Sequence, residues 1–385
     1  MKIAIVHDWL TGMRGGEKCL EVFCRLYPEA DLFTLLHIPG TVSPVIEGMR
    51  IKTSFLQSLP GVARNYRYYL PAMPLAVGQF DLSQYHLVLS SSHCVAKGVT
   101  TGRDSIHICY CYTPMRYIWD QYDQYFGPAR SGALVSTAMR VLRPRLKAWD
   151  VRSSRGVDYF VAISRHVQKR IQSCYRRDAT VIYPPVDTKF YSPAGEEKPE
   201  DFFLMVSAFA PYKRLDLAVE AFKKLGYPLK IIGSGQQLRR LKDAAAPNIE
   251  FLGWLPDEEI RSHYARCRAF IFPGEEDFGI TPLEAQGMGR PVIAFSRGGA
   301  LETVIPEKHS WKPEWDIPED KTKHPTGVFF HEQTPDALVS AVRFFESIEN
   351  RFDPEQIRRH ARQFDVEVFS RRIRAYIENK ISPRC

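Results

Sequence analysis

Hydrophobic residues recur along the chain in two alternating patterns. Short apolar runs, beginning with KIAIV at residues 2–6, predict buried strands. The segment 11–28 that follows has a glycine turn and then apolar residues at helical spacing, which predicts a helix. Further strand-like runs are LFTLLH, HLVLSSS, SIHICYCYT and VDYFVAIS, with helical segments between several of them. This alternation is typical of a largely parallel sheet covered by helices on both faces.

The pattern stops and then restarts in the middle of the chain. Residues 179–202 are polar, contain consecutive prolines at 184–185 and predict an interdomain linker. The alternation then resumes with a helix expected over Leu215–Leu225 and with the strand-like runs FFLMVSA, LKIIGSG, IEFLGWL, AFIFPG and RPVIAF. An amphipathic tail at 364–379 is expected to return to the first domain.

We therefore predict an α/β protein of two Rossmann-like, doubly wound domains that face each other across a cleft. The expected boundaries are 1–190, 191–363 and a C-terminal helix at 364–385. In such sheets ligands bind outside the carboxyl ends of the strands, so we expect the functional site there.

Composition agrees with an ordinary globular protein of two domains. The chain has 385 residues, of which 44% are hydrophobic and 25% charged. No apolar run reaches the roughly 18–20 residues that span a bilayer, and the N-terminal run is too short for a signal peptide. We expect a cytoplasmic protein. The eight cysteines show no zinc spacing, and Cys109 and Cys111 would share one face of a buried strand.

The net charge of +8 is concentrated in the first half. Residues 1–190 carry 24 Lys and Arg against 14 Asp and Glu, or +10, whereas residues 191–385 carry 28 against 30, or −2. The excess lies in RNYRYYL (64–70) and MRVLRPRLKAWDVRSSR (139–155). Basic residues among aromatic ones suit an anionic membrane surface or a phosphorylated ligand, although a solvated helix face has the same pattern. No nucleic-acid motif accompanies them, and we expect no nucleic-acid partner.

The segment FPGEEDFGITPLEAQGMGRPVIAF (272–295) contains the strongest candidates for chemistry. Thr281, Pro282 and Glu284 are spaced like a capping box, which favours a helix-end role for Glu284. Glu276 follows a predicted buried strand, between two further acids. Adjacent carboxylates repel one another unless donors surround them, and a ligand with several hydroxyls supplies donors. The helix start that follows would offer backbone N–H groups to a phosphate.

Four other turns follow predicted strands, three of them in the second domain. Residues 13–18 (MRGGEK) place Gly15 and Gly16 at a strand–helix turn, and residues 211–216 (PYKRLD) place Lys213 and Arg214 where they could neutralise a pyrophosphate. Residues 231–237 (IIGSGQQ) and 251–255 (FLGWL) add glycine turns and an aromatic side chain. Each of these segments alone is more often an ordinary turn. The recurrence of three of them at strand ends of the second domain favours a binding site there.

These residues carry a resemblance to a known family. PYKRLDLAVEAF, IIGSGQQ, FLGW and PGEEDFGITPLEAQGMGRPVIAF resemble the donor half of retaining glycosyltransferases of family four, which have the GT-B fold. Glu276 and Glu284 match that family's E-x7-E motif. HDWLTGMRGGEK and CYTPMRYIWDQYDQYFG resemble the branch that includes mannosyltransferases of polysaccharide and O-antigen assembly.

The resemblance implies a nucleotide-sugar site. Glu276 would bind the hydroxyls of the donor sugar, and Glu284 would face the ribose. Lys213 and Arg214 would neutralise the diphosphate leaving group, which would be the main catalytic contribution and would need no metal. The remaining implied contacts are Gly15 and Gly16 near the diphosphate, Phe278, Gly279, Ile280 and Thr281 around sugar and phosphate, and Gly233, Gly235, Gly253 and Trp254 around the nucleoside.

Two residues depart from the pattern of this branch. Tyr112 stands in CYTP, where the resemblance predicts a histidine near the reaction centre, and Ile163 stands where an asparagine is expected. Tyrosine titrates near 10 and is a poor proton shuttle at neutral pH. Tyr112 is therefore a catalytic candidate whose effect on the rate is open.

The leading hypothesis is a retaining transfer of a hexose, with mannose from GDP-mannose as the expected donor, to a lipid-linked oligosaccharide on the inner face of the membrane. One alternative is a glycosyltransferase of the same fold that uses a UDP-sugar donor. Another is a nucleotide-sugar-binding protein with weak or lost catalysis. An epimerase of the same fold would form product without acceptor. A dehydrogenase is disfavoured because no GxGxxG follows the first strand.

Overall fold

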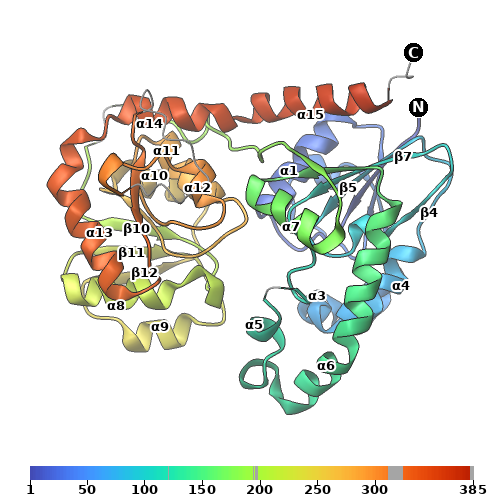
Figure 1. Cartoon of the computed structure of the whole chain (residues 1–385), viewed down its shortest axis with the longest axis horizontal. Helices are drawn as coiled ribbons and strands as arrows, with labels where there is room; N and C mark the ends of the chain where they lie inside the picture. The colour runs from blue at the N-terminus through green and yellow to red at the C-terminus, as the bar shows by residue number, and fades with distance from the viewer. Residues whose placement is uncertain (120, 194, 196–197, 311–323, 382–385) are drawn as a thin grey trace. The chain divides into compact units, whose positions relative to one another are not determined.

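The computed structural model describes all residues except 120, 194, 196–197, 311–323 and 382–385 (Figure 1). The chain forms two compact units, one of residues 1–185 and 367–385 and the other of residues 186–366. The boundaries thus fall at 185/186 and 366/367, where the sequence pattern placed 190/191 and 363/364. The backbone N–H of Val186 donates to the carbonyl of Phe364 at 2.9 Å, so the chain enters the second unit directly after the two prolines.

The first unit contains a parallel sheet with the strand order β3-β2-β1-β5-β7-β8-β9. Its central strands have buried side chains on both faces, as the continuous apolar runs predicted. The strands are β1 Ile3–His7, β2 Asp31–Thr34, β3 Arg50–Thr53, β5 Leu87–Ser92, β7 Ile106–Cys111, β8 Tyr159–Ala162 and β9 Ala179–Val181. The sequence pattern did not indicate the edge strands β3 and β9, because they are short and partly exposed.

Helices and a short two-stranded sheet complete this unit. The helices are α1 Gly15–Leu26, α2 Pro44–Glu47, α3 Val62–Asn65, α4 Met73–Gly78, α5 Tyr122–Phe126, α6 Pro128–Ser153 and α7 Arg165–Tyr175, and β4 Asp81–Leu82 pairs with β6 Thr100–Thr101. Helix α1 confirms the helix that was predicted after the first strand, and its apolar face is buried.

A buried ion pair attaches α6 to the first unit. Lys97 and Asp150 pair in the interior, where their side chains are 2% and 0% exposed. The other carboxylate oxygen of Asp150 accepts hydrogen bonds from Trp119 Nε1 and from the Tyr175 hydroxyl, both at 2.8 Å. Burying two charges is costly unless each is paired and hydrogen-bonded, and this network satisfies both.

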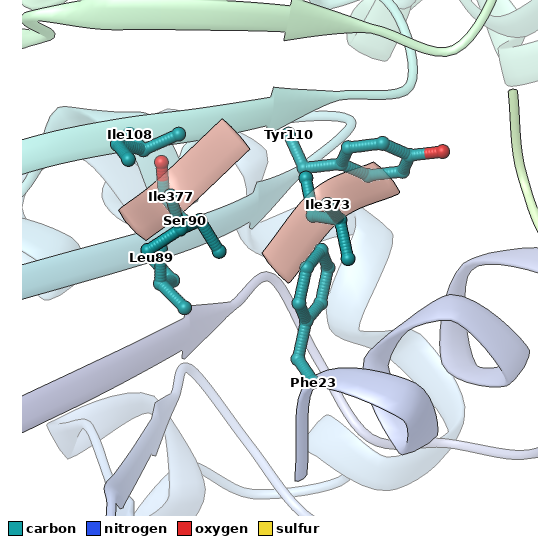
Figure 2. A pocket seen from close by; sticks show the side chains of 7 residues that line it. All are labelled: Phe23, Leu89, Ser90, Ile108, Tyr110, Ile373 and Ile377. Carbon is teal, nitrogen blue, oxygen red and sulfur yellow. The ribbon is translucent and has the colours of Figure 1, made fainter. Parts of the chain in front are cut away.

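The C-terminal helix α15 (Val366–Ile381) packs on the first unit from Glu367 onward, as the amphipathic tail predicted. Figure 2 shows Ile373 and Ile377 over side chains of β5 and β7, with Phe23 of α1 beside them. Phe369 adds edge-on ring contacts to Phe23 at 5.9 Å and to Tyr110 at 5.5 Å. This apolar packing holds the end of the chain on the first unit.

The second unit repeats the architecture with the order β12-β11-β10-β13-β14-β15, again with parallel pairing. The strands are β10 Phe203–Val206, β11 Leu229–Ile232, β12 Ile249–Gly253, β13 Phe270–Phe272, β14 Val292–Phe295 and β15 Gly327–Phe330. The helices are α8 Leu215–Leu225, α9 Leu238–Ala244, α10 Asp257–Arg266, α11 Ile280–Gly287, α12 Ala300–Thr303, α13 Pro335–Ile348 and α14 Pro354–Ala361. The bounds of α8 are those that the sequence pattern predicted.

Both sheets reverse their direction of winding at one point. In the first unit the chain winds outward to either side of β1 and β5, and in the second to either side of β10 and β13. Ligands of doubly wound sheets bind outside the carboxyl ends of the two strands at such a switch point. The loops after these four strands are therefore where each unit is expected to carry its chemistry.

Candidate functional site

The switch point of the second unit carries an ion pair between two predicted site residues. Lys213 follows β10, Glu276 follows β13, and the Lys213 ammonium contacts the Glu276 carboxylate directly. Both side chains are 17% exposed, so the pair is shielded yet reachable from solvent. The two residues predicted to bind sugar and diphosphate thus lie side by side, although 63 positions separate them in the sequence.

Tightly packed backbone fixes the loop that carries Glu276. The carbonyl of Glu276 accepts a 2.7 Å hydrogen bond from the N–H of Gly299. A Cβ at Gly299 would lie 2.2 Å from the Phe278 Cα, so no larger residue fits there. On the other side, a Cβ at Gly274 would lie 2.7 Å from the Tyr212 carbonyl, beside Lys213. Close backbone approach therefore sets the position of both charged side chains.

The three consecutive acids do not form a cluster that needs a ligand. Glu275 is exposed, Glu276 pairs with Lys213, and Asp277 is 8% exposed. The sequence suggested that the hydroxyls of a ligand supply donors to Glu276, and the structure shows that Lys213 supplies one within the chain.

The capping-box interpretation of Glu284 is wrong. Helix α11 begins at Ile280 and its N-cap is Gly279, with φ at 106°, so Thr281 lies inside the first turn. Only glycine adopts such a backbone conformation readily, and it starts the helix before Thr281 can cap it. Glu284 is 5% exposed and accepts a 3.1 Å hydrogen bond from the buried Tyr264 hydroxyl. Burial and the Glu284 carboxylate together raise the pKa of Tyr264 well above its usual range.

The remaining predicted residues of α11 lie at its start. Phe278 is buried and packs its ring against Phe364, with ring centroids 5.8 Å apart. Gly279, Ile280 and Thr281 form the N-cap and the first two positions of the helix, directly after the Glu276 loop. Backbone N–H groups at such positions have no acceptor within the helix and can bind an anion.

The Arg214 guanidinium is hydrogen-bonded to two other side chains. It donates to Asp216 at 3.2 Å and to the Gln333 side chain at 3.1 Å. The Gln333 amide in turn donates to the carbonyl of Pro273 at 3.0 Å. Gln333 therefore links Arg214 to the loop that carries Glu276. Sequence spacing gave no sign of Gln333, which lies beyond β15.

The glycine turns of the second unit have a packing explanation. A Cβ at Gly233 would lie 1.9 Å from the Ser207 carbonyl, and one at Gly235 would lie 2.9 Å from backbone atoms of Phe209. Gly253 instead has open space around its Cα and is followed by Trp254, which is 75% exposed. The Gly253–Trp254 turn therefore presents an exposed aromatic side chain, and residues 234–236 of the other turn are exposed as well.

In the first unit, Tyr112 is part of the hydrogen-bonded framework. It follows β7 and is 9% exposed, and its hydroxyl donates to the Gly16 carbonyl at 2.8 Å, with Ser91 Oγ also at 2.8 Å. Burial raises the pKa of Tyr112 well above its usual range. Gly15 and Gly16 are the first two residues of α1. The predicted residues Gly16 and Tyr112 are thus in contact, but the tyrosine hydroxyl is engaged with the protein.

Two residues at the switch point of the first unit were not predicted. His93 follows β5, and its Nδ1 lies 3.1 Å from Oδ2 of Asp8, which follows β1. Asp8 is fully buried, whereas the His93 side chain is 23% exposed. Both residues follow predicted strands in the sequence, and a titratable side chain at the end of a buried strand was the available signal.

No set of three or more potential metal ligands comes together within the described ranges. Cys109 and Cys111 are buried in β7, as expected of core residues. Across the part of the chain that the structure describes, no helix is long and apolar enough to cross a bilayer.

Comparison with known proteins shows which families and folds this chain is similar to. Residues 187–364 match the family model described as Glycosyl transferases group 1. O-antigen chain mannosyltransferase C of Escherichia coli is 29% identical over 170 residues, covering 40% of this chain and 46% of that protein. Alpha-1,3/1,6-mannosyltransferase alg2 of Schizosaccharomyces pombe is 23% identical over 310 residues, covering 68% of this chain and 58% of that protein. The chain spans about half the length of the curated relatives it matches.

Solved structures extend the likeness to the whole fold. Anabaena Alr3699/HepE in complex with UDP-glucose has a TM-score of 0.67 at 15% identity and covers 98% of this chain and 100% of its own. Sucrose-phosphate synthase from Thermosynechococcus elongatus has a TM-score of 0.70 at 15% identity, with coverage of 99% and 100%. The predicted fold class is confirmed: the chain has two parallel-sheet α/β units of the GT-B type, and it resembles the mannosyltransferase branch of these glycosyltransferases.

Proposed function

We propose that the chain is a retaining hexosyltransferase that transfers mannose from GDP-mannose to a lipid-linked saccharide. The observation that carries the proposal is the Lys213–Glu276 pair at the switch point of the second unit, in the half of the chain that matches the glycosyltransferase family. Mannose is favoured as the sugar because several relatives are named mannosyltransferases, among them a GDP-mannose-dependent enzyme of Corynebacterium glutamicum.

The pair provides two complementary functions within one unit. The Glu276 carboxylate would accept hydrogen bonds from donor-sugar hydroxyls, and the Lys213 ammonium would face the diphosphate. Breaking the bond between the sugar and the phosphate develops negative charge on the diphosphate, and a fixed cation stabilises that charge most in the transition state. The N–H groups at the start of α11 would add donors from the same loop.

Glu284 would bind the ribose through its carboxylate, beside the hydroxyls of Tyr264 and Tyr191. A carboxylate offers about four acceptor positions, so it can accept from a ribose hydroxyl in addition to protein donors. Trp254 and Gly253 would border the base, since this turn is accessible. No metal is needed in this arrangement, because protein cations and backbone donors supply the positive field.

A basic and apolar surface of the first unit supports a membrane-bound acceptor. The segment around η2 (Tyr66–Ala72) and α4 shares one hydrophobic core with α6. The exposed side chains of these elements include Arg67, Tyr68, Leu75, Arg140, Val141, Arg145 and Arg152. Cationic and apolar side chains together bind anionic bilayers through charge and apolar burial. We propose that this surface docks on the anionic membrane that carries the acceptor.

The experiment for the membrane surface is sedimentation of the full chain with vesicles. Vesicles of phosphatidylglycerol should bind the protein, and Arg140→Glu with Arg145→Glu should abolish binding without loss of helical signal. Equal binding to phosphatidylcholine, or an unchanged double variant, would contradict the docking surface and favour a solvated helix face.

A UDP-sugar donor is the second candidate, because solved structures of the same fold contain UDP or UDP-glucose. Calorimetric binding of GDP-mannose, UDP-glucose, UDP-N-acetylglucosamine and NAD distinguishes a GDP-sugar donor from a UDP-sugar donor.

A nucleotide-sugar-binding protein with weak catalysis is the third candidate, favoured because the hydroxyl of Tyr112 is engaged with the protein. It predicts donor binding without transfer, and Tyr112→His tests whether a histidine at this position increases transfer.

A further inference from the structure

We propose that His93, oriented by Asp8, is the residue of the first unit that accepts a hydrogen bond from a sugar hydroxyl of the substrate. This inference rests on the proposed function and adds a substrate-contacting residue to it. The hydroxyl belongs either to the donor sugar or to the acceptor saccharide, and the experiment below distinguishes the two.

The first observation is the position of the two residues. The first sheet reverses its winding between β1 and β5, and the carboxyl ends of these two strands lead directly into Asp8 and His93. A doubly wound sheet binds ligands at this point. The pair stands at the place in the first unit that corresponds to Lys213 and Glu276 in the second.

The second observation is the way in which Asp8 is held. Its carboxylate accepts four backbone N–H groups, those of residues 93, 94, 95 and 96, at 2.7, 3.0, 2.6 and 2.8 Å. These bonds fix the carboxylate in the interior and keep one oxygen 3.1 Å from the Nδ1 of His93. A neutral imidazole in this position carries its proton on Nδ1, so its Nε2 is a hydrogen-bond acceptor.

The third observation concerns the surroundings of the ring. Trp9 contacts His93 edge-on, with ring centroids 4.5 Å apart, which restricts rotation of the imidazole. The Tyr112 hydroxyl nearby is engaged with Gly16 and Ser91, and the Nδ1 of His7 with Ser91 at 3.0 Å. The Nε2 of His7 is buried 3.6 Å from the Glu17 carboxylate, whereas the His93 side chain is 23% exposed. Within the described part of the chain, no hydrogen bond to the Nε2 of His93 is found, and the side chain reaches solvent.

The protonation state agrees with an acceptor role. Burial lowers the pKa of His93 below its usual value, and the charges of His7 and Arg116 act in the same direction. The carboxylates of Asp8 and Glu17 oppose this shift without cancelling it. The ring is therefore neutral at pH 7. As the pH falls through the lowered pKa, Nε2 gains a proton and can no longer accept, so substrate contact should be lost on the acid side.

A purely structural role makes a different prediction. Asp8 would then serve only to bind the backbone of residues 93–96, and the imidazole of His93 would be an incidental neighbour. In that case replacing the ring would leave the rate and its pH dependence unchanged, because the four N–H bonds to Asp8 do not involve the side chain.

The test compares His93→Gln with His37→Gln in the full chain. His37 is a matched control, a histidine of the same unit whose Nε2 lies 2.9 Å from the carboxylate of Glu47 and so faces the protein. We would measure hydrolysis of GDP-mannose by water and transfer to octyl α-mannoside from pH 5 to 8.5. His93→Gln should lower kcat/KM by about 10²-fold at pH 7 and remove the acid limb that we expect for the wild type, whereas His37→Gln should leave both unchanged.

The two reactions identify the source of the hydroxyl. Loss of both hydrolysis and transfer assigns the contact to the donor sugar. Loss of transfer alone, with a raised KM for the mannoside, assigns it to the acceptor. A variant that keeps the wild-type rate and acid limb in both reactions overturns the inference and leaves the proposed function standing.

A second measurement does not depend on the variant. In ¹⁵N-histidine NMR of the wild type, His93 should show the tautomer with the proton on Nδ1, and its Nε2 signal should move on addition of GDP-mannose or octyl α-mannoside. A signal unmoved by either probe overturns the inference. A wild-type chain that binds no nucleotide sugar at all in calorimetry instead refutes the proposed function.

Discussion

Each unit of this molecule contains an ion pair between a lysine and a carboxylate, and the two pairs differ in enclosure. Lys97 and Asp150 in the first unit are almost inaccessible, and two further hydrogen bonds complete the coordination of the carboxylate. Lys213 and Glu276 in the second unit are each 17% exposed and lie in loops at a switch point. The same pairing of charges thus stabilises the fold in one place and remains accessible to a ligand in the other.

The difference shows how location decides the role of a charged pair. The Lys97–Asp150 pair joins α6 to the loop after β5 and is itself almost inaccessible, so its removal should affect folding. The Lys213–Glu276 pair joins two loops whose backbone is already fixed by glycine packing, so its removal should affect function. The predictions below test this separation, beginning with the largest expected effect.

Asp150→Ala should lower the free energy of unfolding of the first unit by about 3–5 kcal/mol, because it leaves Lys97 charged and unpaired in the interior. Unfolding by urea, followed by Trp fluorescence, measures the loss. Asp336→Ala is the control: its carboxylate pairs with Lys224 on the surface, where the side chains are 80% and 50% exposed, and we expect a change below about 1 kcal/mol. Equal effects of the two substitutions would contradict the role given to the buried pair.

Glu276→Ala should reduce transfer by about 10²–10³-fold while leaving the fold intact, because it removes the proposed sugar acceptor from a loop held by its backbone. Transfer from radiolabelled GDP-mannose and circular dichroism measure the two properties. The neighbouring Glu275→Ala removes an exposed acid of the same type and should retain most activity. A Glu276→Ala variant as active as the wild type would refute the site.

Lys213→Met should weaken donor binding by about 10–10²-fold, since the ammonium is the proposed diphosphate contact. Arg214→Met should weaken it less, because its guanidinium is bound to Asp216 and Gln333. Calorimetry with GDP-mannose measures both. The reverse order of effects would show that Arg214, and not Lys213, is the main diphosphate ligand.

Tyr112→Phe should have the smallest effect, a loss of about 1–2 kcal/mol in stability, because the Gly16 carbonyl loses its donor in a buried site. Transfer should fall less than in Glu276→Ala. Parallel measurement of unfolding and of rate checks this expectation, and a loss of rate with unchanged stability would restore Tyr112 as a catalytic residue.

Most strands of the two sheets and the helix α8 could be predicted from the sequence because hydrophobic periodicity reports directly on burial, although the buried edge strand β15 was missed. The edge strands β3 and β9 could not, since one or both faces of an edge strand are partly exposed and the apolar run is lost. The capping box at Thr281 failed for a local reason: Gly279, with its positive φ, starts α11 before Thr281 can cap it.

The site was predicted in part. Lys213 and Glu276 were found because each follows a buried strand, but their pairing depends on β10 and β13 being neighbours, which no spacing in the sequence reveals. His93 and Asp8 were missed for the same reason, since β1 and β5 are adjacent only in the folded sheet. Contacts across a sheet are set by strand order, and strand order is a property of the whole unit.

The central claim is that the Lys213–Glu276 switch point binds a nucleotide sugar. Calorimetric titration of the full chain with GDP-mannose, alongside UDP-glucose, UDP-N-acetylglucosamine and NAD, tests it most directly. The account predicts micromolar binding of GDP-mannose that is weakened by about 10–10²-fold in Lys213→Met and retained in Glu275→Ala. Binding of no nucleotide sugar by the wild type, or equal binding by Lys213→Met, would contradict it.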